Sequence, residues 1–127
     1  MSATLTVWAG WLCLIAALGG SLLAVLQLRG GGPPPIPWQA GAVHGLVGAA
    51  GLALLVLALD RPGPPAPPGT GGFRFAGVVI LSLALLAGLT ILGVRLRRGR
   101  FGSGLVGVHA ALAITGLAVL GARLLAG

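Results

Sequence analysis

Long apolar runs, separated by short breaks, dominate the pattern of hydrophobic and polar positions along this chain of 127 residues. The runs extend over about 5–28, 38–59, 75–94 and 103–122. Each has close to the twenty residues that an α-helix needs to cross a hydrocarbon core of about 30 Å. The pattern therefore predicts an all-α integral membrane protein, a bundle of four transmembrane helices.

The breaks contain prolines, glycines and arginines, which are typical of the ends of membrane helices. The segment 60–72, with the sequence DRPGPPAPPGTGG, is predicted to be a stiff proline-rich connector without apolar content for a core. No basic side chain precedes the first run, which is also long for a signal peptide, so we expect a retained helix. We expect one membrane domain over residues 1–127 and no soluble domain.

The second half of the chain repeats the first. The sequence VHGLVGAAGLALL begins at Val43, and VHAALAITGLAVL begins at Val108, 65 positions later. A run, an arginine-containing break and a second run occur in each half, which predicts two tandem helical hairpins with the same topology, a parallel repeat. His44 and His109, the only histidines, occupy matched positions and should lie level in the bundle.

The composition agrees with a lipid bilayer as the main partner. Hydrophobic residues make up 57% of the chain and charged residues 7%, and the mean hydropathy is +1.07. The net charge of +7 comes from eight arginines and a single acid, but these arginines flank apolar runs and form no basic face with interleaved aromatics, so we expect no nucleic-acid binding.

The arginines also give an expected orientation. Five of them fall in the two breaks within the hairpins and three on the opposite side. The positive-inside tendency then places both termini and the proline-rich connector outside the inner membrane of a bacterium.

Two level histidines at membrane depth are a candidate haem site, because iron binds neutral imidazole nitrogens and bundle proteins build cofactor sites between facing helices. Small residues four and seven positions after each histidine share its helix face and leave room for a flat ring. These residues are Gly48, Gly51, Ala113 and Gly116. Arg29, Arg95 and Arg98 lie toward the histidine end and could pair with haem propionates.

With these residues the chain resembles the small four-helix membrane cytochromes b that hold haem between two histidines. The resemblance implies haem b with His44 and His109 as axial metal ligands, and Gly48, Gly51, Ala113 and Gly116 facing the ring. It implies an electron-transfer or anchoring subunit, without a catalytic site of its own, in a larger respiratory or photosynthetic complex. The chain departs from the two-haem members, which need four histidines, and it has no acid within a run for quinone protonation.

Two alternatives stay open. In the first, the protein is a cofactor-free accessory subunit whose histidines hydrogen-bond a neighbouring helix, for example Ser82 or Thr90 or a carbonyl group. In the second, one histidine binds the magnesium of a chlorophyll-type pigment, although that would not require two matched histidines. Zinc or copper transport is disfavoured, because two histidines without carboxylates or thiolates fall short of a metal site. Hydrolysis is disfavoured, because Ser21, Ser82 and Thr115 have no acid partner.

Overall fold

The computed structural model describes residues 2–29, 36–59, 68–69, 72–98 and 102–125. These residues form four α-helices and no strand: α1 (Ser2–Leu28), α2 (Trp38–Leu59), α3 (Phe73–Arg98) and α4 (Ser103–Leu125). All four helices are long and apolar enough to cross a membrane. The prediction of an all-α bundle of four membrane-spanning helices is confirmed. Most of the connector predicted over 60–72 lies outside the described residues.

The helix bounds differ from the predicted ones mainly at the end of α3. We expected this helix to end near Val94, but it continues through Arg95, Arg97 and Arg98. Arginine is a good helix former, and a cation in the last turn interacts favourably with the helix dipole. Hydropathy therefore detects where the apolar run ends, one turn before the helix itself ends.

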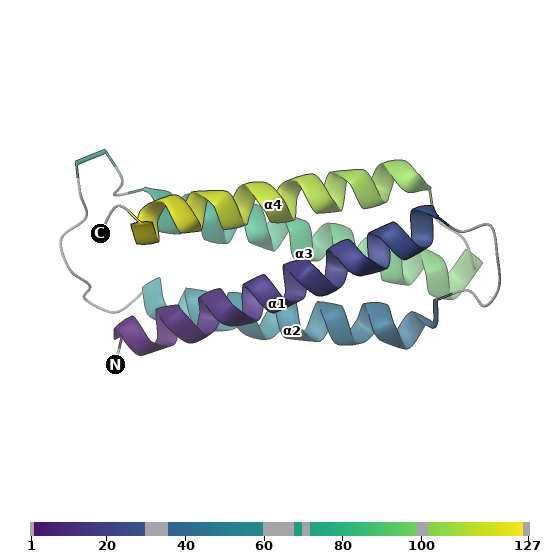
Figure 1. The fold of residues 1–127 in the computed structure, drawn as a ribbon, viewed down its shortest axis with the longest axis horizontal. Helices are drawn as coiled ribbons and strands as arrows, with labels where there is room; N and C mark the ends of the chain where they lie inside the picture. The colour runs from purple at the N-terminus through teal and green to yellow at the C-terminus, as the bar shows by residue number, and fades with distance from the viewer. Residues whose placement is uncertain (1, 30–35, 60–67, 70–71, 99–101, 126–127) are drawn as a thin grey trace.

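The helices run alternately up and down, so that both chain termini lie at one end of the bundle (Figure 1). The end of α1 and the start of α2, with the end of α3 and the start of α4, lie at the opposite end. Among the described residues, α1 packs closely on α2 and α3 on α4, whereas the two hairpins contact each other less, through α2 with α3 and α1 with α4. α2 and α4 therefore lie on a diagonal of the bundle, with no close backbone contact between them.

Small residues fill the contacts within each hairpin. The buried apolar residues are mostly alanines, and no large side chain in the described residues is fully buried. Gly51 of α2 lies against Cys13 of α1, and Gly116 of α4 lies against Leu81 of α3. Membrane helices associate through such close approach of their backbones, because lipid provides no hydrophobic drive for the association.

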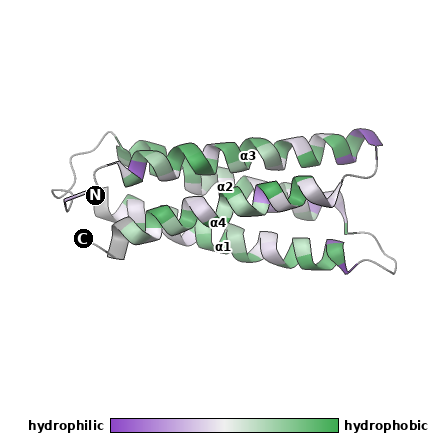
Figure 2. Cartoon of the chain, turned by 90° about the horizontal axis from the view of Figure 1, so that it is seen from above, coloured by the Kyte–Doolittle hydropathy of each residue, from purple (hydrophilic) through white to green (hydrophobic). Residues whose placement is uncertain are grey.

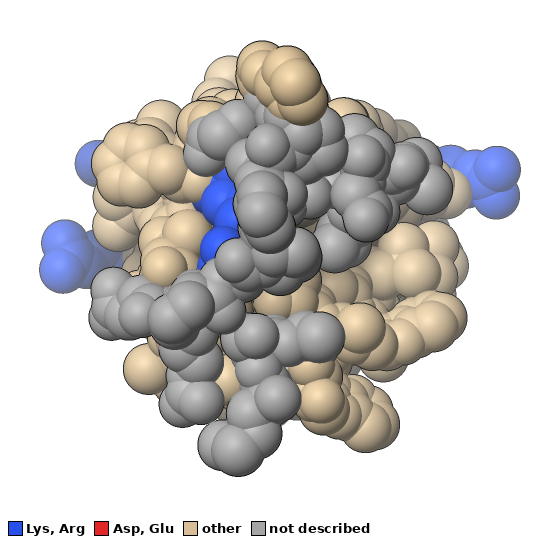
Figure 3. All heavy atoms as spheres, turned by 90° about the vertical axis from the view of Figure 1, so that its left-hand side faces the viewer, with Lys and Arg blue, Asp and Glu red and all other residues tan. Residues whose placement is uncertain are grey.

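Large apolar side chains cover the outside of the bundle. Exposed leucines and valines occur on each of the first three helices, and apolar colouring extends along the helices in Figure 2. The view onto the end with the two termini shows basic atoms and no acidic ones among the described residues (Figure 3). Such an apolar surface requires a lipid environment, so the protein is an integral membrane protein.

Candidate cofactor-binding cavity

The repeat places the two histidines at the same depth. α2 begins at Trp38 and α4 begins at Ser103, so His44 and His109 are each the seventh residue of their helix. Because α2 and α4 run in the same direction, both histidines lie about two turns from the end that carries the α1–α2 and α3–α4 connections. The two histidines therefore lie level in the bundle, as predicted.

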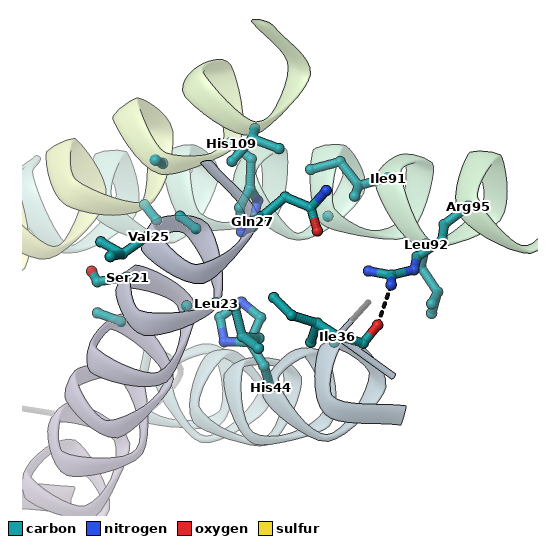
Figure 4. Close-up of a pocket in the computed structure, with 18 of the residues that line it drawn as sticks. Ser21, Leu23, Val25, Gln27, Ile36, His44, Ile91, Leu92, Arg95 and His109 are labelled. Atoms are coloured by element: carbon teal, nitrogen blue, oxygen red, sulfur yellow. Dashed lines mark hydrogen bonds between the residues drawn. The ribbon is translucent and has the colours of Figure 1, made fainter. Parts of the chain in front are cut away.

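The two imidazoles face one another across the diagonal of the bundle (Figure 4). Their ring centroids are 5.9 Å apart and their planes are perpendicular. A metal–imidazole bond is about 2 Å long, so two imidazoles on opposite sides of one metal have ring centroids about 6 Å apart. A separation of this size fits two imidazoles that share one metal, and it also fits a T-shaped contact between the rings.

His109 is held by a neighbouring helix. Its Nδ1 lies 2.8 Å from the backbone carbonyl oxygen of Ala84 on α3. A carbonyl oxygen can only accept a hydrogen bond, so Nδ1 carries the proton and donates it. The neutral ring then has its lone pair on Nε2, the arrangement common in metal-bound histidines, where the second nitrogen donates to a carbonyl group.

His44 is held differently. The corresponding backbone carbonyl, that of Ala16 on α1, faces its ring. Its Nδ1 is nevertheless buried and makes no hydrogen bond of normal geometry with the described residues. A buried polar nitrogen without a partner costs about 1–3 kcal/mol. Nδ1 of His44 is therefore a buried polar atom without a hydrogen bond inside an apolar bundle.

Both histidines line a cavity of about 360 Å³ between the two hairpins. This volume lies within the range of small-molecule and cofactor sites, about 300–1,000 Å³. All four helices contribute to its wall, which is mainly apolar and includes Gly20, Gly41 and Gly88. Ser21, Gln27, Trp38 and Arg95 add polar groups. An apolar cavity with a few polar groups is typical of a ligand site.

The small residues predicted to face a bound ring lie mostly elsewhere. Of the four, only Ala113 lines the cavity. Gly48 packs on Ala16, and Gly51 and Gly116 form the close contacts within the hairpins described above. The ring-facing assignment of Gly48, Gly51 and Gly116 is therefore corrected: these positions share the histidine's helix but face the hairpin partner.

The three arginines predicted to pair with haem propionates do not lie together. Arg95 lines the cavity, and its guanidinium donates a hydrogen bond to the backbone carbonyl of Ile36 just before α2 (Figure 4). Arg29 and Arg98 are exposed and are not among the cavity residues. Of the proposed propionate partners, only Arg95 is placed to contact a ligand in the cavity.

The hydroxyl groups considered as histidine partners are engaged with their own helix. Ser82 donates to the carbonyl of Val78, and Thr90 donates to that of Leu86. Such bonds to the carbonyl four residues earlier are local and compete with interhelical ones. The polar partner of His109 is therefore a backbone carbonyl.

A metal site made of protein side chains alone has no support. The described part of the chain contains no group of three or more His, Cys, Asp or Glu side chains that could hold a metal ion. Zinc sites use at least three such ligands. Two histidines alone leave the other coordination positions of a metal to further ligands, which a macrocycle such as a porphyrin can provide.

Sequence reasoning missed Gly20 and Gly88, which lie directly against the two imidazoles. The sequence does contain this second repeat, but the two glycines recur at a different interval from the two histidines. The histidines are 65 positions apart, whereas these glycines are 68 apart. Comparing the first and third helices separately from the second and fourth would have found them.

Comparison of the chain with models of known protein families, with curated proteins and with solved structures gives no match. The functional assignment therefore depends on the geometry of the cavity.

Proposed function

We propose that the protein is a membrane cytochrome of b type that holds one haem between His44 on α2 and His109 on α4. The observation that carries the proposal is the pair of level imidazoles, 5.9 Å apart, that both line one cavity. A haem would provide a one-electron redox couple whose potential the surrounding protein adjusts.

The residues present fit that group in three respects. The hydrogen bond from His109 to the Ala84 carbonyl leaves Nε2 as the free ligand nitrogen. The cavity wall is mostly apolar, as a porphyrin face requires. Arg95 offers a cation at the cavity for a carboxylate, and guanidinium–carboxylate pairs are strong and directional.

The remaining parts of the proposal concern the surroundings of the protein. We propose an electron-transfer or anchoring subunit of a larger respiratory or photosynthetic complex in a bacterial inner membrane, because no helix carries an acid or nucleophile arranged for catalysis. Arg29, Arg95, Arg97 and Arg98 gather at the end with the histidines. The positive-inside tendency favours a cytoplasmic location for this end.

A cofactor-free accessory subunit is the second candidate, and the hydrogen bond between His109 and Ala84 favours it, since it ties α4 to α3. The same explanation does not extend to His44, whose buried Nδ1 has no partner of normal geometry in the described residues. A histidine kept only to join helices would be expected to satisfy its buried nitrogen. The accessory role therefore accounts for His109 but not for His44.

The test is a reduced-minus-oxidised absorption spectrum of the detergent-purified protein, with a pyridine haemochrome assay for stoichiometry. We expect about one b-type haem per chain, from two axial histidines. The signal should be lost in His44→Ala and His109→Ala, and kept in Val43→Ala and Val108→Ala, whose side chains are exposed next to each histidine. Added imidazole should restore a haem spectrum to the histidine variants.

A colourless protein, prepared with haem supplied throughout expression and purification, would contradict the haem proposal and leave the accessory subunit. A chlorophyll-type absorption band without reducible iron would identify a pigment. A haem signal that survives loss of either histidine would show that the metal is held elsewhere.

A further inference from the structure

Each imidazole lies in a notch formed by a glycine of the neighbouring helix. A Cβ atom added to Gly20 on α1 would lie 2.6 Å from Cε1 of His44. A Cβ atom added to Gly88 on α3 would lie 3.0 Å from Cε1 of His109. The distance at Gly20 is too short for a real methyl group, so a side chain there would displace the ring of His44. At Gly88 the contact would be tight, and the ring of His109 would have to move by a few tenths of an ångström.

One turn before each glycine is a buried alanine. Ala84 precedes Gly88 by four residues, and its carbonyl oxygen accepts the hydrogen bond from His109. In an α-helix that oxygen also accepts from the amide of Gly88, and a carbonyl oxygen has two lone pairs for the two donors. The missing side chain at Gly88 lets the imidazole reach the second lone pair.

The same arrangement occurs in the first hairpin. Ala16 precedes Gly20 by four residues, is buried, and its carbonyl faces the ring of His44. From Ala16 to Ala84 and from Gly20 to Gly88 the interval is 68 positions, although the histidines are 65 apart. The α3–α4 connection is five residues shorter than the α1–α2 connection, and α3 continues two residues further beyond its glycine than α1 does, which together give the difference of three. The structure therefore pairs these positions where a single alignment of the two halves does not.

We infer that Ala16 with Gly20, and Ala84 with Gly88, are positioning residues that set the orientation of His44 and His109 at the cavity. Their effect on a metal rests on the haem function proposed above. The glycine provides the space for the ring. In the second hairpin the carbonyl of Ala84 also fixes Nδ1 as the protonated nitrogen of His109. Neither pair contacts the metal itself.

Two glycines in open space provide matched controls. A Cβ atom on Gly19 of α1 or on Gly93 of α3 would have no heavy atom within 4 Å. Gly20→Ala and Gly88→Ala are therefore compared with Gly19→Ala and Gly93→Ala, which make the same change on the same helices. Reactivity of Cys13, the only cysteine and a buried one, reports whether each variant is folded.

In the protein loaded with haem, the readout is the low-spin electron paramagnetic resonance signal, which depends on the orientation of the axial imidazoles. We expect Gly20→Ala and Gly88→Ala to shift this signal and to lower haem affinity about tenfold or more, as loss of a residue that orients a ligand does. The controls should keep the wild-type signal. Wild-type spectra in folded Gly20→Ala and Gly88→Ala would overturn the inference.

In the protein without haem, ¹⁵N-histidine resonances test the same residues independently. Gly88→Ala should shift the Nδ1 resonance of His109, because the displaced ring has a weaker hydrogen bond to Ala84, and Gly93→Ala should not. If the wild-type protein binds no haem but these shifts occur, the haem proposal fails and the positioning role stands. If the resonances do not move, the positioning role is wrong. Gly88→Ala, with the less severe clash, carries the test if Gly20→Ala does not fold.

Discussion

Gly51 of α2 and Cys13 of α1 are in such close contact that a Cβ atom on the glycine would lie 2.8 Å from the cysteine Sγ and 3.1 Å from its backbone nitrogen. Gly116 and Leu81 form the equivalent contact in the second hairpin. Backbone atoms cannot move aside as a flexible side chain can. These contacts therefore fix how deeply the helices of each hairpin pack.

We expect Gly51→Ala to destabilise the first hairpin by about 1–3 kcal/mol, the usual cost of overpacking. The rate of thiol modification at Cys13 should rise, because this side chain is only 6% exposed in the folded protein. Gly45→Ala on the same helix is the control, since a Cβ atom there would have no neighbour within 4 Å. Equal thiol reactivity in the two variants would contradict the tight contact.

The two histidines should contribute unequally to the stability of the protein without haem. His109 has a hydrogen bond to the carbonyl of Ala84, whereas Nδ1 of His44 is buried without one. Both substitutions by alanine remove the same ring, but only one also removes a bond. We therefore expect His109→Ala to lower the free energy of unfolding by about 1 kcal/mol more than His44→Ala.

Loss of helical signal during titration with a denaturing detergent measures this difference, with haem withheld from all samples. The comparison requires no third variant, because each histidine serves as the control for the other. Equal losses, or a larger loss in His44→Ala, would mean that the His109 hydrogen bond does not stabilise the bundle.

Arg95 should influence a bound haem in a way that the other arginines do not. It lines the cavity, whereas Arg98 is exposed at the end of α3. Replacing a nearby cation by a neutral group stabilises oxidised iron, so Arg95→Gln should lower the midpoint potential and weaken haem retention. Arg98→Gln should change neither property. The measurement is a spectroscopic redox titration, and similar shifts in both variants would exclude a specific role for Arg95.

The helices and the level of the histidines could be predicted from the sequence because both depend on local features. Hydropathy locates each apolar run, and Val43-His44 and Val108-His109 recur in register at the start of two such runs. The depth of a residue follows from its distance along its own helix. Those predictions did not require knowledge of which helices touch.

Whether the small residues face the cavity or a partner helix could not be predicted in the same way. Gly48, Gly51 and Gly116 share a helix face with a histidine, but a face can point to a cavity or to a partner helix. The choice depends on the rotation of each helix, and every helix here is apolar all round, so polarity does not set it. Gly20 and Gly88 went unnoticed because their partners are on another helix.

Arg74 should stabilise the end of the bundle away from the cavity. It is the second residue of α3, and its guanidinium donates a hydrogen bond to the carbonyl of Ala58 in the last turn of α2. The last carbonyls of a helix have no partner within the helix, and a basic side chain can satisfy one of them. This bond joins the two hairpins at the end that carries the chain termini.

Arg74→Gln should therefore lower the free energy of unfolding by about 1.5–3 kcal/mol, the range for a hydrogen bond to a charged group. It should leave a haem spectrum and its midpoint potential unchanged, because the cavity lies at the opposite end of the bundle. Arg97→Gln, at an exposed position, controls for the loss of charge alone. If Arg74→Gln changed the spectrum without affecting stability, the cavity would depend on how the two hairpins are joined at the far end, and the histidines could not be treated as a local site.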